Sequence, residues 1–212
     1  MRIERAVAVL PVLPGDEPHL DACLEQLVAA ADEASAAGVP TELVAVLAPG
    51  AAGAPGAAGA LGAAGAAGAA AAALVRSWEP LVALLEGVRL GAEPAPAGAA
   101  TAQDVLAAGA AAVAGRLPRP AGAVVLTTAP SVAVGSRWIT EHVHHHAGGA
   151  RASTGPVRGA AGAHPLRLNL ALRADLLLRC GPAALTGAVD RPLVHAVTPS
   201  VGLLAAGQPA SS

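Results

Sequence analysis

The pattern of apolar positions predicts three short strands. The strands cover Ala6–Leu13, Glu42–Leu47 and Val124–Thr127. Each run is almost continuously apolar rather than alternating, and turn residues or helical segments flank it. Such runs are typical of strands that are buried on both faces of a parallel sheet.

Between these runs the apolar spacing changes to that of helices. Leucines at 20, 24 and 27, followed by Val28 and Ala31, predict a helix opened by Gly15-Asp16, with Asp16 as its N-cap. A second helix is predicted over Gln103–Leu117. It ends before Pro118, because proline cannot continue a helix. The run Leu81–Leu90 fits a helix in its first part, whereas its end is also compatible with a strand.

The alternation of strands and helices predicts one α/β domain over residues 1–212. We expect a Rossmann-like fold in which a mostly parallel central sheet is flanked by helices. The three strands should be neighbours in that sheet. Ligands of such folds lie beyond the carboxyl ends of the strands, where Thr127–Ser131 would be placed.

Residues 51–73 form an Ala/Gly-rich, low-complexity insert. The segment is long enough to span a bilayer, but Ala and Gly contribute little transfer free energy, which argues against membrane association. Each Gly also weakens a helix by about 1 kcal/mol relative to Ala. We expect a flexible or partly helical insert with few core contacts.

Composition narrows the function classes. The chain has 212 residues, no Phe, Tyr or Lys, and a formal charge of −2, so a broad basic surface for nucleic acid is excluded. Cys23 and Cys180 have no Cys-x-x-Cys spacing and are predicted to be small buried side chains of a reducing compartment. The N-terminus has no signal-peptide pattern, which favours the cytoplasm.

The segment AVVLTTAPSVAVGSRW, residues 123–138, resembles the donor site of glycosyltransferase family 2. There a strand ends in Asp-x-Asp, which holds a divalent metal against the donor diphosphate. Here these positions are Ala129, Pro130 and Ser131, so both carboxylates are missing. The resemblance implies a GT-A fold, whereas the replaced acids predict no Mg²⁺ or Mn²⁺ site and no cofactor.

The C-terminal third extends the resemblance. Residues 169–175 match a family segment in which Asn and Arg lead into a helix, and 187–193 (GAVDRPL) resemble Gly-x-Glu-Asp-x-x-Leu. That motif's Asp is the catalytic base of inverting members, which implies this role for Asp190. The second strand leads into Leu47-Ala48-Pro49, where the family has an Asp that contacts the nucleotide base.

The resemblance thus implies a nucleotide-sugar donor and an unknown acceptor as ligands. The candidate donor-binding residues are Thr128, Ser131, His164, Asn169 and Arg173. In a site without metal, guanidinium or imidazole groups could contact the diphosphate.

Each candidate also has a structural interpretation. Asp190 could cap the Arg191-Pro192 turn, His164 could pack beside Pro165, and Arg173 could pair with Asp175.

A cluster of histidines follows Trp138, which we expect to be a core residue. His142 and His146 share one helical face, yet there is no His-Glu-x-x-His motif, so a solvated helix end is favoured over a zinc site.

Two function classes follow. The first is a glycosyltransferase family 2-like enzyme that works without metal, with activity reduced or lost. The second is a non-catalytic relative that uses the same scaffold for binding.

Overall fold

The computed structural model describes most of the chain. The described residues are 2–48, 61–96, 98–99, 101–155, 157–158, 169–181, 194–196 and 201–203. None of the helices in these ranges is long and apolar enough to cross a membrane.

Strands and helices alternate along the first two thirds of the chain. The elements there are β1 (Arg5–Val12), α1 (Glu17–Ala36), β2 (Thr41–Leu47), α2 (Leu61–Val82), β3 (Val88–Pro94), α3 (Ala102–Arg116), η1 (Pro120–Gly122) and β4 (Ala123–Thr127). Shorter elements follow: β5 (Val132–Ala133), α4 (Trp138–Ala147), β6 (Ala152–Thr154), β7 (Val157–Arg158), β8 (Leu170–Arg173), α6 (Ala174–Cys180), β9 (Val194–Ala196) and β10 (Val201–Leu203).

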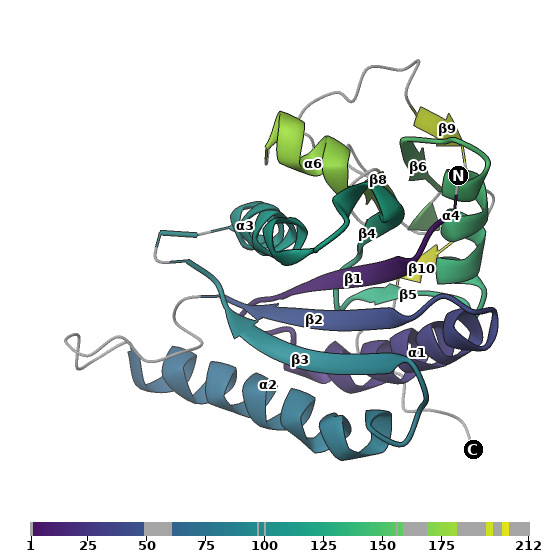
Figure 1. The fold of residues 1–212 in the computed structure, drawn as a ribbon. Helices are drawn as coiled ribbons and strands as arrows, with labels where there is room; N and C mark the ends of the chain where they lie inside the picture. Colours follow the sequence, from purple (N-terminus) through teal and green to yellow (C-terminus); the bar gives the residue numbers. More distant parts are fainter. Residues whose placement is uncertain are drawn as a thin grey trace.

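A seven-stranded sheet with the order β3-β2-β1-β4-β8-β6-β9 forms the centre of the domain (Figure 1). The pairs β3–β2, β2–β1, β1–β4 and β6–β9 are parallel, and β8 is antiparallel to both of its neighbours. Strands β5, β10 and β7 form a separate small sheet. The predicted α/β domain is therefore confirmed, as is the neighbourhood of its three predicted strands.

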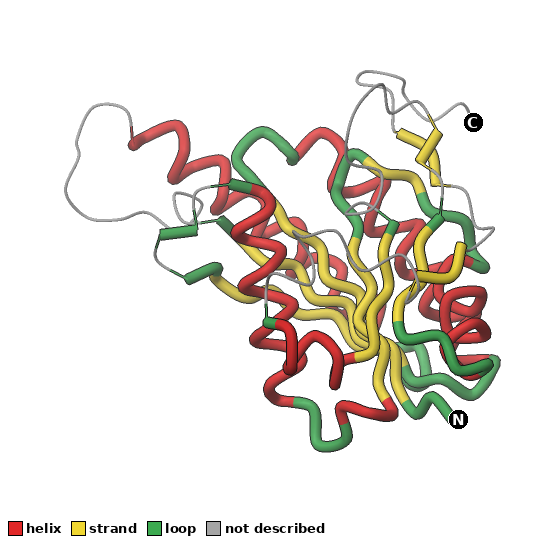
Figure 2. Tube along the Cα trace, turned by 90° about the horizontal axis from the view of Figure 1, so that it is seen from above, coloured by secondary structure: helices red, strands yellow, loops and turns green. Residues whose placement is uncertain are grey.

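Helices cover both faces of the sheet (Figure 2). One core layer lies between the sheet and α1, α2 and α4, and the other lies between the sheet and α3 and α6. The central strands are buried on both faces, which explains why their sequences are continuously apolar. Gly109 of α3 lies directly on Val46 of β2, so a methyl group at position 109 would collide with that side chain.

The structure refines the helix boundaries. α3 begins one residue before the predicted start, because Thr101 and Asp104 form a reciprocal capping box. Asp16 occupies the N-cap position of α1, but its carboxylate accepts from the Leu13 N–H instead of capping the helix. The ambiguous run 81–90 divides into the end of α2, a turn at Gly87 with φ of 73°, and β3.

The Ala/Gly-rich insert is in part a packed helix. Residues 51–60 lie outside the described residues, but α2 begins at Leu61 and buries Ala71 completely against the core. The small side chain of Ala71 allows the helix to approach the domain closely. Among residues 69–73, whose side chains the structure describes, Ala71 is the only buried one.

The cysteines differ from one another. Cys23 is buried, as predicted, and burial together with the charge of Asp16 raises the pKa of its thiol to about 12. Cys180 is exposed, contrary to the prediction, because it is the last residue of α6.

Candidate functional site

Three of the predicted site residues lie at one edge of the central sheet. We call it the carboxyl edge, because the parallel strands β1, β2 and β4 all end there. Thr128 directly follows β4, and Ser131 lies three residues further on, just before β5. Asn169 precedes the antiparallel strand β8, and since Leu170 pairs with Thr127, Asn169 lies at the same edge. The topology thus gathers residues that are about forty positions apart in the sequence.

Thr128 is fully buried at this edge. Its N–H donates to the Val9 carbonyl at 3.4 Å, so the backbone continues the pairing with β1. Its Oγ1 has no hydrogen-bond partner in the described part of the chain. An unsatisfied buried hydroxyl costs about 1–3 kcal/mol. Ser131 is half-buried and leads into β5.

The unpaired hydroxyl gives a direct test of Thr128. Thr128→Val keeps the side-chain shape and removes the unsatisfied polar group, so we expect the free energy of unfolding to rise by about 1 kcal/mol in the unliganded protein. Urea titration measures this change, and Thr127→Val is the matched control. Thr127 Oγ1 donates to the Leu170 carbonyl at 3.2 Å, and its replacement should destabilise. A loss of stability in Thr128→Val would mean that the hydroxyl has a partner.

Asn169 lies in the interior behind the carboxyl edge. It is fully buried, and its Oδ1 accepts from Trp138 Nε1 at 2.8 Å and contacts His142 Nε2 at 3.0 Å. Trp138 is also buried, as predicted. Asn169 thus ties α4 to the start of β8 and is a positioning residue for this edge.

The histidines of α4 complete a buried polar network. His142 Nδ1 lies 2.7 Å from Ser153 Oγ, and His146 Nε2 lies 3.0 Å from the same oxygen. Because Asn169 Oδ1 only accepts, His142 Nε2 carries a proton and Nδ1 accepts from Ser153. Ser153 Oγ then accepts from His146 Nε2–H. Every ring can therefore be neutral.

The prediction of a solvated histidine cluster is wrong for two of its members. His142 and His146 share one helical face, as the spacing predicts, but both are fully buried. Burial lowers the pKa of each imidazole to about 4, because the interior disfavours the charged ring. Neighbouring positive charge acts in the same direction, from His145 on His142, and from His142 and Arg173 on His146. Within the described residues, no group of His, Cys, Asp and Glu side chains is arranged to hold a metal ion.

Arg173 does not lie at the carboxyl edge. It pairs with Val124 near the start of β4, so about 10 Å of strand separates it from Thr127. Its Nε donates to Asp175 Oδ1 at 2.8 Å, and its Nη2 donates to Asp175 Oδ2 at 2.7 Å. Arg173 thus forms the ion pair with Asp175 that its structural interpretation predicts. Burial raises the pKa of Asp175, but Arg173 and Arg179 outweigh burial and lower it overall.

Two carboxylates lie at the carboxyl edge: Asp16, in the loop between β1 and α1, and Glu17, the first residue of α1. Asp16 Oδ2 accepts from the Leu13 N–H at 2.8 Å, and Glu17 Oε2 accepts from the Gly15 N–H at 2.9 Å. Burial raises the pKa of Asp16. These contacts take up two N–H groups of the loop that precedes α1.

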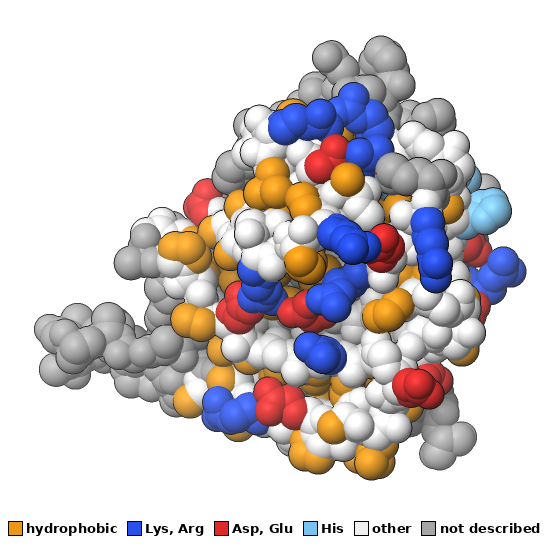
Figure 3. All heavy atoms as spheres, viewed as in Figure 1, with side chains coloured by type: hydrophobic (Ala, Val, Ile, Leu, Met, Phe, Trp, Pro, Cys, Tyr) orange, Lys and Arg blue, Asp and Glu red, His pale blue; other side chains and the backbone are white. Residues whose placement is uncertain are grey.

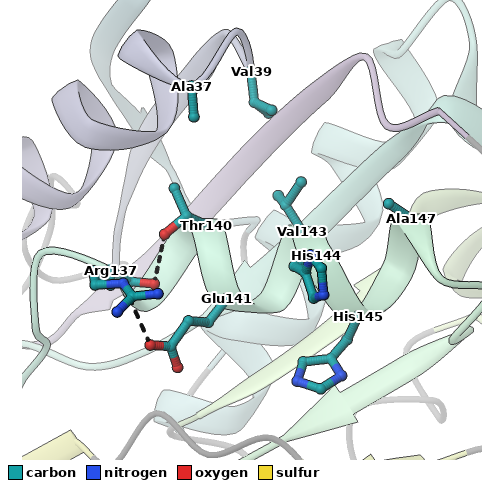
Figure 4. A pocket seen from close by; sticks show the side chains of 9 residues that line it. All are labelled: Ala37, Val39, Arg137, Thr140, Glu141, Val143, His144, His145 and Ala147. Atoms are coloured by element: carbon teal, nitrogen blue, oxygen red, sulfur yellow. Dashed lines mark hydrogen bonds and ion pairs between the residues drawn. The ribbon is translucent and has the colours of Figure 1, made fainter.

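A surface hollow lies elsewhere. Its volume is about 600 Å³, and it opens between the outer face of α4 and the residues that precede β2, among them Ala37 and Val39 (Figure 4). Arg137 at its rim is 3.8 Å from Glu141 and 4.0 Å from Glu33. The hollow is at the amino end of β2 and is separate from the carboxyl edge.

Asp190 and His164 lie outside the described residues. The structure therefore unites Thr128, Ser131 and Asn169 and separates Arg173 from them. Sequence reasoning missed Ser153 and the Asp16–Glu17 loop contacts. The one sequence feature that points to the network around Ser153 is the spacing of His142 and His146, which places both on one helical face.

Comparison with solved structures supports the fold. A 4-diphosphocytidyl-2C-methyl-D-erythritol synthase superposes with a TM-score of 0.51 at 11% sequence identity, over 99% of this chain and 94% of that chain. This chain has the same fold. The corresponding synthase of Anaerococcus prevotii DSM 20548 gives a TM-score of 0.49 at 8% identity, with 92% and 89% of the two chains covered. No protein-family model and no curated protein matches the sequence.

Proposed function

We propose that this chain is a degenerate nucleotide-sugar transferase, related to glycosyltransferase family 2, that binds a nucleotide or nucleotide sugar at the carboxyl edge and has lost most or all transfer activity. The observation that carries the proposal is the buried hydroxyl of Thr128, directly after β4, which has no hydrogen-bond partner among the described residues. It combines with the half-buried Ser131 and with a fold whose ligands bind beyond the strand ends.

The proposal assigns a role to each polar residue. Thr128 and Ser131 donate to the donor substrate, and Asn169 holds α4 and β8 in place behind them. Asp190 is the base that takes the acceptor proton, and His164 contacts the diphosphate. Arg173 is left out, since it is paired with Asp175 at the far end of β8.

The weak step of this chemistry is departure of the nucleotide. Negative charge builds on the leaving phosphates, and metal-dependent enzymes neutralise it through a divalent cation held by carboxylates. Ala48, Ala129 and Ser131 provide no carboxylate, and Mg²⁺ keeps its waters unless several hard oxygens replace them. Any residual transfer should therefore be independent of metal.

Ligand binding can be measured by thermal shift. At 100 times the dissociation constant a ligand stabilises the fold by about 2.7 kcal/mol, which corresponds to a rise in Tm of about 5–10 °C for a chain of this length. We expect such a shift with UDP, GDP, CDP or their sugars, unchanged by Mn²⁺. Thr128→Val and Ser131→Ala should reduce it, whereas Thr140→Val, on the outer side of α4, should leave it unchanged. No shift with any nucleotide would contradict the proposal.

A gain-of-function variant tests the lost metal site. Ala129→Asp combined with Ser131→Asp restores the spacing of two carboxylates, so calorimetry should detect Mn²⁺ binding in the presence of UDP. The unmodified chain should bind no Mn²⁺ at this edge. Tight Mn²⁺ binding by the unmodified chain would refute the degenerate-site assignment.

One observation favours the second function class, a non-catalytic scaffold. Asp16 and Glu17 already occupy the Leu13 and Gly15 N–H groups and place negative charge where a phosphate would approach. If this loop excludes nucleotides, Asp16→Asn combined with Glu17→Gln should bind UDP more tightly than the unmodified chain. Equal affinity would remove this argument for the scaffold.

A further inference from the structure

β3 is the outermost strand at one end of the central sheet, and no described strand pairs with its outer edge (Figure 1). Ala95 donates to the Leu47 carbonyl at 2.7 Å, and the Gly87 carbonyl accepts from Thr41 at 2.8 Å. Backbone groups alternate in direction along a strand. The backbone N–H and C=O groups of Arg89, Gly91 and Glu93 therefore also point toward β2. The intervening Val88, Leu90 and Ala92 direct their N–H and C=O groups away from the sheet. An edge of this kind is a template for another strand.

The side chains of β3 make this edge complementary to itself. An antiparallel copy centred on Gly91 places Arg89 opposite Glu93 of the copy, and Glu93 opposite its Arg89. Leu90 and Ala92 then face one another and exchange backbone hydrogen bonds. Arg89 and Glu93 fall in the non-hydrogen-bonded positions, where side chains are closest. Shifting the register by two residues in either direction removes both ion pairs.

The local surroundings leave room for such a partner. Arg89 is exposed and makes no ion pair within the described residues, and Gly91 has open space around the position of a Cβ atom. Glu93 contacts Arg116 through one carboxylate oxygen, which leaves the second for a partner.

Acidic and basic side chains lie interspersed over the molecular face shown in Figure 3.

Exposed apolar side chains lie in the segment that leads into β3. Leu81 and Leu84 are 57% and 82% exposed, and they lie at the end of α2 and in the turn that leads into β3. The described residues include only one other exposed large apolar side chain, Leu178. Exposed leucines close in sequence to a strand with an open edge are typical of a surface that is covered in an assembly.

We propose that the β3 edge, formed by the outward backbone groups of Val88, Leu90 and Ala92, binds a second copy of this chain in an antiparallel, two-fold symmetric pairing centred on Gly91. The pairing continues the seven-stranded sheet across the dimer. The Arg89–Glu93 pairs fix its register, and the two-fold axis closes the assembly at two copies.

Cross-linking tests the register directly. Gly91 lies on the proposed two-fold axis, where the two Cα atoms would be about 4.5 Å apart, within the range of a disulfide. In a Cys180→Ser background, Gly91→Cys should form an intermolecular disulfide on mild oxidation. Arg89→Cys is the matched control on the same strand face. It should not cross-link, because position 89 lies opposite Glu93 of the other copy and not opposite its own equivalent. Cross-linking of both or of neither variant would overturn the proposed register.

Oligomeric state tests the interface itself. Light scattering coupled to size exclusion should show a dimer for the unmodified chain. Ala92→Pro removes an outward N–H without breaking a bond to β2, and Arg89→Glu opposes Glu93 of the copy; both should be monomeric with unchanged circular dichroism. Arg76→Glu, an equal charge change on the exposed side of α2, should remain dimeric. A monomeric unmodified chain, or a dimer that survives both edge variants, would refute the proposal.

Discussion

Acidification from pH 6.5 to pH 4 should remove several kcal/mol of folding stability. His142 and His146 have a folded pKa of about 4 against an ordinary value of 6.5, because burial disfavours the charged rings. Between these values the unfolded chain binds more protons than the native chain, so stability falls as the pH falls. Each ring contributes about 3 kcal/mol over this window and nothing further above it.

Urea denaturation at a series of pH values measures this effect. His142→Gln combined with His146→Gln should flatten the dependence between pH 6.5 and 4, even if the variant is less stable at neutral pH. His144→Gln combined with His145→Gln is the matched control, since these side chains lie on the outer side of the same helix, and it should keep the full dependence. A free energy of unfolding that is constant over this range would mean that the two rings are not buried as neutral groups.

Removal of the Trp138 side chain should be the most destabilising single truncation near the carboxyl edge. The indole is 1% exposed, it stacks edge-on against His142 at 5.7 Å between ring centroids, and its Nε1 donates to Asn169. Trp138→Ala therefore leaves a cavity and an altered polar network, at a cost of about 3–5 kcal/mol. Thermal unfolding should show a fall in Tm of about 10 °C.

Two comparisons separate the packing from the hydrogen bond. Trp138→Phe keeps most of the volume and loses the donor to Asn169 Oδ1, so its cost should be smaller than that of the alanine variant. Trp78→Ala is the matched control, because the other tryptophan is half-buried and its Nε1 pairs with Asp21 on the surface. Equal losses in Trp138→Ala and Trp78→Ala would contradict the central place of Trp138 in the core.

The sequence by itself determined the architecture of the parallel half of the sheet. Strands buried on both faces must be continuously apolar, and the runs at Ala6–Leu13, Glu42–Leu47 and Val124–Thr127 carry that signal. Helical spacing after Asp16 and the stop at Pro118 fixed two of the helices. Each of these signals depends only on residues that are close in the sequence, so the sequence alone locates these strands and helices.

The tertiary structure alone decided which polar residues meet. The antiparallel direction of β8 places Asn169 beside Thr127 and Arg173 at the other end of the sheet, although only three residues separate the two. Ser153 has no sequence signal, yet it joins His142 to His146, because β6 lies beside β8 behind α4. Burial, not spacing, then makes these histidines neutral, since the free energy of a charged ring depends on its surroundings.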